Sequence, residues 1–211
     1  MKFLSAKSDA LCNTLKSELE RYRYKVFVET LGWDLPSREG RETDQFDHDD
    51  TYYVIARDEE GRINGCARLL PTDRQYLLGE IFPQLMAGQA PPRHHDIWEL
   101  SRFTSMDLHD NRNTLEDTFR LLRKAIATAA TLGARRIISV SPVGIERLLR
   151  QGGFATERAG PPMRVNGHLL YACWIDIPVL ERPIRALPAR LWRILNARSA
   201  ATPRAQIAGA A

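Results

Sequence analysis

The chain has 211 residues, 44% of them hydrophobic, which suits one domain with a sizeable core and at most an additional tail. Its three cysteines have no paired spacing, no run approaches the roughly 18 apolar residues of a membrane span, and we find no signal peptide, so we expect a cytoplasmic protein rather than a secreted or membrane protein. The formal net charge of +4 is unevenly distributed: residues 1–100 contain 13 Lys/Arg against 18 Asp/Glu, and residues 101–211 contain 17 against 8. An acidic and a basic half suggest two partners of opposite charge, with solvated faces of no special meaning as the alternative.

The first half of the chain predicts a helix followed by three strands. Apolar residues recur at helical spacing from Leu11 to Tyr22, which predicts an amphipathic helix over residues 8–22. Two runs rich in β-branched and aromatic residues flank a turn at 58–61 and predict a hairpin. The expected segments after the helix are a surface loop at 34–50, strands at 51–57 and 62–70, a short helix at 77–86 broken by Pro83, a loop at 87–96 and a strand at 97–103.

A long helix and a set of short elements follow in the second half. Thr114 and Asp117 form a capping box at the start of the helix, and Gly133 should end it. The later segments are a strand at 134–141, a short helix at 143–151, and strands at 154–160 and 168–177. We therefore expect one domain at 1–177 and a tail at 178–211, rich in Arg, Ala and Pro, that is partly helical or disordered.

This order of elements predicts the fold class. Helices that alternate with strands, after an early hairpin, favour an α/β fold with a single mixed, mostly antiparallel sheet flanked by helices. The order resembles that of the acetyltransferases (GNAT-like proteins), in which a central pair of strands is splayed. Fold order alone does not fix a function, so the function has to come from the polar residues.

Charged side chains interrupt apolar segments at three separate places in the chain. Buried singly, each would cost several kcal/mol, about the penalty of an unpaired ion in a protein interior, whereas paired and hydrogen-bonded charges can coexist. Such a network could bind a zwitterion, with Arg facing a carboxylate and Asp or Glu facing an ammonium group. Unrelated surface ion pairs are the alternative. The network would consist of three cations and three anions: Arg23, Arg68, Arg102, Asp44, Asp47 and Glu99.

Two spaced sets of residues carry a resemblance to a known family: Arg23-x3-Phe27-x5-Trp33-x-Leu35 and Glu42-x-Asp44-x-Phe46-Asp47. Together with GCARLLPT (65–72), YLL (76–78) and WELSRF (98–103), in this order, they resemble the acyl-homoserine-lactone synthases, the autoinducer synthases of bacterial quorum sensing. The resemblance covers roughly residues 20–176. Thr30 departs from it, because the family usually has a basic or amide residue there.

The resemblance implies a two-step reaction. An acyl group passes from an acyl carrier protein to the α-amine of S-adenosylmethionine, and the carboxylate then closes a lactone and expels methylthioadenosine. Glu99 would act as the base, directly or through a water molecule, and Arg102 would orient the substrate. S-adenosylmethionine is a substrate here, so no cofactor and no metal are expected. The implied catalytic set is Glu99, Arg102, Ser101, Arg68, Asp44, Asp47 and Arg23, and the implied S-adenosylmethionine contacts are Phe27, Trp33, Arg23, Asp47 and Arg102.

The same resemblance predicts a slot for the thioester. Strand alternation places Glu99 and Ser101 on one face and Arg102 on the other, so we expect a bulge or splay that turns Arg102 and opens this slot. The expected acyl-chain pocket consists of Leu100, Ile138, Val140, Ser141, Val143, Ile145 and Leu149. Family members that take 3-oxo chains tend to have Thr at the position of Ser141, which favours an unsubstituted chain of short-to-medium length here.

A basic surface should receive the acidic carrier protein. Two predicted helices supply it, with solvated helix faces as the alternative reading. The candidates are Arg147, Arg150, Arg123 and Lys124, with Arg120 beside them.

Three other functions fit the sequence less well. Asp44, Asp47 and residues 48–50 do not have the spacing of a calcium loop. A GNAT-type N-acetyltransferase that uses acyl-CoA would need a Gly-rich pyrophosphate loop, and residues 139–149 lack one. A nucleic-acid-binding module could use the Arg-rich tail, but it would leave the charged residues inside apolar segments unexplained.

Overall fold

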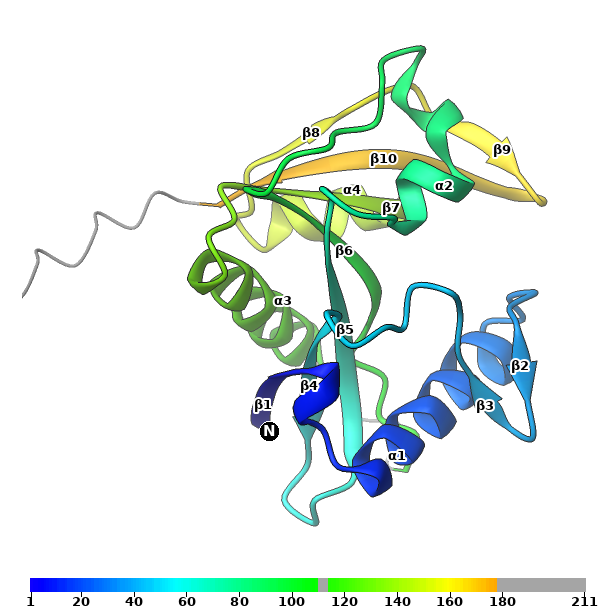
Figure 1. Ribbon diagram of the computed structural model, residues 1–211, viewed down its shortest axis with the longest axis vertical. Coiled ribbons are helices and arrows are strands. Elements are labelled where there is room, and N and C mark those ends of the chain that lie inside the picture. Colours follow the sequence, from blue (N-terminus) through cyan, green and yellow to red (C-terminus); the bar gives the residue numbers. More distant parts are fainter. Residues whose placement is uncertain (110–113, 178–211) are drawn as a thin grey trace, which may run out of the picture. The chain divides into compact units, whose positions relative to one another are not determined.

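The computed structural model describes residues 1–109 and 114–177. Their central element is a mixed β-sheet (Figure 1). Its strand order is β1-β4-β5-β6-β7-β10-β8, with β9 paired to β10, and only the β6–β7 pair in it is parallel. The strands are β1 (Lys2–Lys7), β4 (Tyr52–Arg57), β5 (Ile63–Pro71), β6 (Ile97–Thr104), β7 (Arg136–Pro142), β8 (Thr156–Arg158), β9 (Met163–Val165) and β10 (His168–Asp176). A separate two-stranded hairpin joins β2 (Ser37–Arg38) to β3 (Arg41–Glu42).

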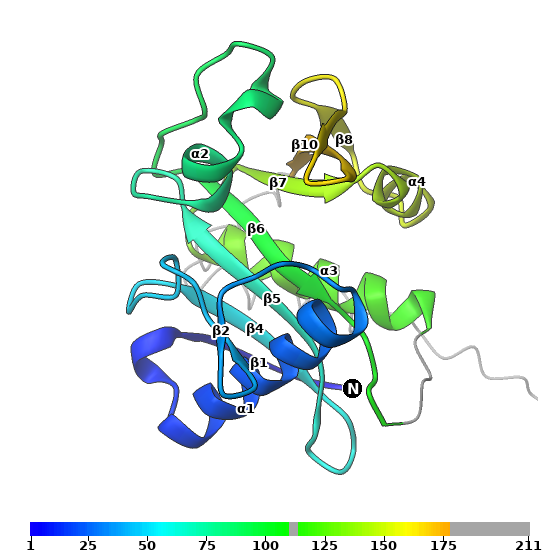
Figure 2. The same ribbon diagram turned by 90° about the vertical axis from the view of Figure 1, so that its right-hand side faces the viewer.

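Helices cover both faces of the sheet. Figures 1 and 2 show α1 and α3 on opposite sides of the central strands. One face packs against α3 and α4, and the other packs against α1, α2 and the short helical segment that follows each of them. The helical segments are η1 (Ser8–Ala10), α1 (Asn13–Arg23), the π-helical η2 (Tyr24–Thr30), α2 (Leu77–Ile81), η3 (Pro83–Met86), α3 (Leu115–Thr131) and α4 (Gly144–Gln151). No helix among the described residues is long and apolar enough to cross a membrane.

Alternation along each central strand explains the two-sided core. Val54 and Ala67 point to the α3 side, whereas Ile55 and Cys66 point to the α1 side. The ends of α3 follow the sequence signals: the Thr114 hydroxyl accepts a hydrogen bond from the Asp117 N–H at 3.0 Å, and Gly133 has a φ of +94°. The predicted fold class, a mixed and mostly antiparallel sheet between helices, is therefore confirmed.

The centre of the sheet contains two irregularities, where the alternation in β6 predicted a bulge or a splay. In the β5–β6 pair, Arg68 lies opposite Ser101 but Cys66 lies opposite Thr104, so β6 has one extra residue, and Arg102 has a φ of +48°. The parallel pairing of β6 with β7 ends at Glu99 and Ile138, although both strands continue. The bulge turns Arg102 out of strict alternation, and beyond Glu99 the two strands separate.

Several boundaries differ from those predicted. Strand β1 and the hairpin β2–β3 were not expected, because each depends on pairing that its own sequence does not reveal. Helix α1 begins at Asn13 rather than residue 8, since the N–H of Ser8 donates to the carbonyl of Thr51 and holds η1 against the sheet. The π-helical η2 and strand β9 were also missed, and β8 covers only the middle of its predicted segment. The tail predicted at 178–211 lies outside the described residues.

Candidate active site

Three arginines and three carboxylates meet on the α1 side of the sheet and form a closed ring of alternating charge. Each guanidinium contacts two carboxylates and each carboxylate contacts two guanidinium groups. No side chain in the ring is more than 11% exposed, so water screens these contacts little. We call this cluster the charge ring, and its members, in order around it, are Arg23, Glu42, Arg102, Asp44, Arg68 and Asp47.

Arg23 closes one side of the ring from the last residue of α1. Its Nε donates to Glu42 Oε2 at 2.6 Å, and its two terminal nitrogens donate to the two oxygens of Asp47 at 2.8 and 2.9 Å. Asp47 also accepts from the hydroxyl of Tyr53 at 2.6 Å. The forked contact with Asp47 uses the planar geometry of a guanidinium group, which a lysine does not have.

Arg68 and Arg102 close the opposite side from the neighbouring strands β5 and β6. Arg68 donates hydrogen bonds to both oxygens of Asp44 at 2.6 and 3.0 Å, to Asp47 at 2.9 Å and to the Ser101 hydroxyl at 3.0 Å. Arg102 donates to Asp44 at 2.8 Å and to Glu42 at 2.9 and 3.2 Å. The bulge in β6 is what allows Ser101 and Arg102, which are consecutive in the chain, to meet the same network.

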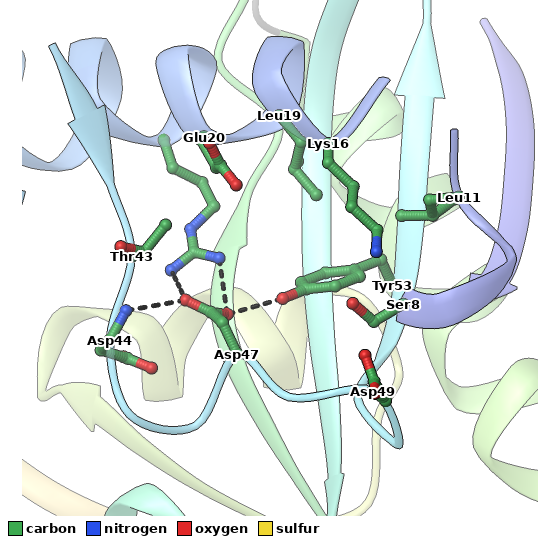
Figure 3. Close-up of a pocket in the computed structure, with 11 residues that line it drawn as sticks. Ser8, Leu11, Lys16, Leu19, Glu20, Thr43, Asp44, Asp47, Asp49 and Tyr53 are labelled. Atoms are coloured by element: carbon green, nitrogen blue, oxygen red, sulfur yellow. Dashed lines mark hydrogen bonds and ion pairs between the residues drawn. The ribbon is translucent and has the colours of Figure 1, made fainter. Parts of the chain in front are cut away.

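The acidic members come from one short segment that holds its own shape. The N–H of Phe46 donates to Asp44 Oδ1 at 2.9 Å. The N–H of Asp44 donates to Asp47 Oδ2 at 2.8 Å, as Figure 3 shows. Burial alone would raise the pKa of Asp47, but the guanidinium groups of Arg23 and Arg68 outweigh it and hold that pKa well below its usual range. Asp47 therefore stays ionised at any physiological pH.

Glu99 does not belong to the ring, which corrects the predicted set of six charges. Its Oε1 accepts from the N–H of Leu78 at 2.7 Å and its Oε2 accepts from the N–H of Leu77 at 2.9 Å. Burial raises the pKa of Glu99 to about 7, and the two amides and the charge of Arg68 only partly oppose that rise. The third anion of the ring is Glu42, which was quoted in the family motif but not chosen as a site residue.

Two aromatic rings lie next to the charge ring. Phe27 and Trp33 stack with their centroids 5.1 Å apart and their planes 27° apart. The guanidinium carbon of Arg102 lies 5.8 Å from the centroid of Phe27. The π-helical η2 contains Phe27, and its wider turn is the irregular segment that follows Arg23. The structure thus brings the predicted aromatic contacts and the charged residues together.

A cavity of about 350 Å³ opens on the ring from the side of α1 (Figure 3). Figure 3 shows Lys16 and Tyr53 reaching into the same space as Asp47. The carboxylates of Glu20 and Asp49 lie at its sides, so its lining is strongly polar. Its wall consists of Ser8, Leu11, Lys16, Leu19, Glu20, Arg23, Thr43, Asp44, Asp47, Asp49 and Tyr53. None of the residues predicted to hold the acyl chain lines this cavity.

The predicted acyl-pocket residues divide between the two faces of the sheet. Ile138 and Val140 pack with the cluster under α2, whereas Leu100, Val143, Ile145 and Leu149 pack with the cluster under α3 and α4. Ser141 is opposite Tyr171 of β10, on the α3 side, and its hydroxyl is 3.4 Å from that of Ser139. A single tunnel on one face of the sheet therefore does not describe these positions.

The predicted docking residues are only partly available for a partner. Arg150 is engaged by Glu146, which also binds Arg158, and Arg123 lies 3.5 Å from Glu116. Arg147 and Lys124 form no ion pair with any described residue. Among the described residues, no group of three or more His, Cys, Asp or Glu side chains is arranged to hold a metal ion.

Comparisons with known proteins point to one family. A family profile described as autoinducer synthase matches residues 8–181. An acyl-homoserine-lactone synthase of Acinetobacter nosocomialis is 49% identical over 169 residues, which cover 77% of this chain and 92% of the relative. Among solved structures, TofI in a ternary complex with an inhibitor and MTA has a TM-score of 0.76 at 45% identity, covering 84% of this chain and 92% of that one. MesI, a CoA-dependent acyl-homoserine lactone synthase, has a TM-score of 0.73 at 27% identity, covering 99% and 97%. The chain belongs to the autoinducer synthase family of enzymes.

Proposed function

We propose that this enzyme is an acyl-homoserine-lactone synthase that acylates S-adenosylmethionine and then lactonises the product. The observation that carries the proposal is the charge ring, which is closed and buried, lies beside the stacked Phe27 and Trp33, and leaves one buried carboxylate, Glu99, outside it. The related TofI was solved with MTA, the by-product of such a reaction, and this supports the same substrate here.

The charge ring and the aromatic pair suit the two ends of S-adenosylmethionine. The Nε and one terminal nitrogen of Arg102 donate within the ring, so its other terminal nitrogen can donate a hydrogen bond to the substrate carboxylate, and the surrounding carboxylates favour the ammonium group. Aromatic faces attract a sulfonium cation through the ring quadrupole, so Phe27 and Trp33 are the expected neighbours of the sulfur. In the ring the three arginines and three carboxylates balance, so the site can bind a zwitterion without a large excess of either charge.

Glu99 is the proposed general base for acyl transfer. A free α-amine has a pKa of about 7.7–8.0 and must lose a proton before it attacks a thioester. Because the pKa of Glu99 is about 7, proton transfer from the ammonium group, directly or through a water molecule, is nearly balanced in energy. The amine nitrogen then forms the bond to the acyl carbon and the thiol leaves. The substrate carboxylate next attacks the γ-carbon, and the bond to sulfur breaks to release methylthioadenosine.

An acyl carrier protein is the proposed acyl donor. Helices α3 and α4 contain five basic residues, of which Arg120, Arg123 and Arg150 pair with acids on the same helices. Lys124 and Arg147 remain as the cations that could contact an acidic protein. The relative MesI is CoA-dependent, so acyl-CoA is the competing donor. Ser141 beside the gap between β6 and β7 favours an unsubstituted chain of short-to-medium length.

In the decisive experiment, purified protein is incubated with S-adenosylmethionine and one of the two acyl donors, acyl carrier protein or coenzyme A. Both donors are loaded with the same series of acyl chains. Mass spectrometry should detect an acyl-homoserine lactone and methylthioadenosine in equal amounts, formed fastest with the carrier-protein thioester. If lactone forms faster from acyl-CoA, the proposed reaction is supported but acyl carrier protein is not the preferred donor. Acetylation of an unrelated amine, without methylthioadenosine, would instead favour a GNAT-type N-acetyltransferase.

A further inference from the structure

The carboxylate of Glu99 is held by a part of the chain that is distant in sequence. Each of its oxygens accepts one backbone hydrogen bond, Oε1 from Leu78 at 2.7 Å and Oε2 from Leu77 at 2.9 Å. The side chain is fully buried in strand β6, whereas the two donors are at the beginning of α2. This contact therefore joins the proposed base to the segment that covers the sheet beside the separated strands (Figure 2).

These two amides have no partner within their own helix. The first N–H groups of a helix lack intrahelical acceptors and are usually satisfied by Ser, Thr, Asp or Asn at the cap position. Here that position is Tyr76, whose hydroxyl instead donates to the carbonyl of Pro92 at 2.6 Å. Glu99 supplies the missing acceptors from the neighbouring strand, so the contact satisfies two donors and one carboxylate at once.

No described cation contacts Glu99 directly. From β5 the nearest charge is Arg68, whose guanidinium is committed to Asp44, Asp47 and the hydroxyl of Ser101. Asp44 opposes its effect, and Tyr76 faces Glu99 from the start of α2. On the other side, β7 contributes the apolar Ile138. The two N–H groups are therefore the direct contacts that favour the ionised form of Glu99.

We infer that the backbone N–H groups of Leu77 and Leu78 are positioning groups for Glu99, which fix the direction of its carboxylate and keep it ionisable in a buried site. Segment α2 then sets the acid–base behaviour of the residue that accepts the proton from the substrate amine. The catalytic part of this inference rests on the proposed function, but the effect on the carboxylate itself does not.

Leu77→Pro tests the inference by deleting one of the two donors. Proline has no N–H, and it is well tolerated at the first position of a helix, which Leu77 occupies. The residue before a proline prefers an extended backbone, and Tyr76 already has φ −147° and ψ 162°. Leu77→Ala is the matched control, because it shortens the same side chain and keeps the N–H.

The measurement is the carboxyl titration of Glu99 by ¹³C NMR in protein free of substrate, with the signal assigned by its loss in Glu99→Gln. A hydrogen bond to an ionised group is strong enough to move a pKa by about one to two units, so the midpoint should rise by that amount in Leu77→Pro and stay at the wild-type value in Leu77→Ala. A folded Leu77→Pro variant with an unchanged midpoint would overturn the inference.

The wild-type protein provides a second test if Leu77→Pro fails to fold. The amide resonances of Leu77 and Leu78 should shift with pH at the same midpoint as the carboxyl signal, and this response should vanish in Glu99→Gln. Amide chemical shifts that do not change at the midpoint of the carboxyl titration would contradict the contact. In turnover assays, the acidic limb of the pH profile of kcat/KM should move to higher pH in Leu77→Pro than in Leu77→Ala. Failure of the wild-type protein to make lactone would refute the proposed function, but both NMR tests would still stand.

Discussion

Two kinds of buried carboxylate occupy the same face of the sheet and behave in opposite ways. Arg23 and Arg68 donate hydrogen bonds to Asp47 and hold its pKa well below the usual range. Glu99 accepts hydrogen bonds from two backbone amides, and its burial raises its pKa to about 7. A carboxylate locked against guanidinium groups cannot accept a proton near neutral pH. The protein thus separates two tasks: the charge ring provides a fixed electrostatic frame, and Glu99 provides a group that can titrate.

Glu99→Gln should produce the largest effect, and that effect is on the rate of catalysis. Glutamine matches the shape of the side chain and retains one oxygen for an α2 amide, but it cannot accept the proton of the substrate amine. Loss of a general base costs about 10²–10⁴-fold in rate, so lactone formation should fall by that factor. Single-turnover assays with circular dichroism as the fold control would measure it, and a wild-type rate would remove Glu99 from the mechanism.

Glu42→Ala should have the next largest effect, and on stability. It leaves Arg23 and Arg102 each short of a buried partner, and breaking a buried ion pair by removing one partner costs about 3–5 kcal/mol. Urea unfolding would show this loss in the free energy of unfolding. Glu59→Ala, at an exposed position with no ion pair among the described residues, is the control and should change it little. Equal effects of the two substitutions would mean that the ring contributes no more than surface charge.

The contrast between the two regions also predicts opposite dependences of stability on pH. Asp47 has a depressed folded pKa, so its contribution is complete above its unfolded pKa, about 3.9, and is lost as the pH falls below it. Glu99 has a raised folded pKa, so the folded state holds the proton more tightly and loses stability as the pH rises from about 4.5 to about 7.

The difference between wild type and Glu99→Gln isolates the second dependence. Relative to the wild type, the variant should gain about 2–3 kcal/mol in the free energy of unfolding between pH 5 and pH 8, because the wild type must ionise a buried group and the variant does not. Urea unfolding at several pH values would measure it. A difference that stays constant with pH would show that Glu99 is ionised as easily in the folded protein as in the unfolded chain.

These residues also show how far the sequence could lead. The polar positions inside apolar segments indicated a buried network, and strict alternation at Glu99, Ser101 and Arg102 required the bulge that the structure contains. Charge counting alone, however, could not tell Glu42 from Glu99, because either acid completes a balanced set of three cations and three anions. What distinguishes them is contact with α2, a tertiary feature with no local signal. Strand β1 was missed for the same reason, since its partner β4 is about fifty residues away.

The smallest predicted effect concerns the surface rather than either buried region, and it separates the two possible donors. Arg147 forms no ion pair with the described residues, whereas its neighbour Arg150 is engaged by Glu146. If an acidic carrier protein docks on α4, Arg147→Glu should raise the KM for the acyl carrier protein several-fold, because reversing one exposed charge changes encounter by roughly 1 kcal/mol or less. The KM for S-adenosylmethionine should stay constant, since the charge ring is untouched. Added salt should weaken wild-type binding of the carrier protein and reduce the difference between the two proteins. An equal rise in KM for acyl-CoA would mean instead that Arg147 contacts the phosphopantetheine arm that both donors share.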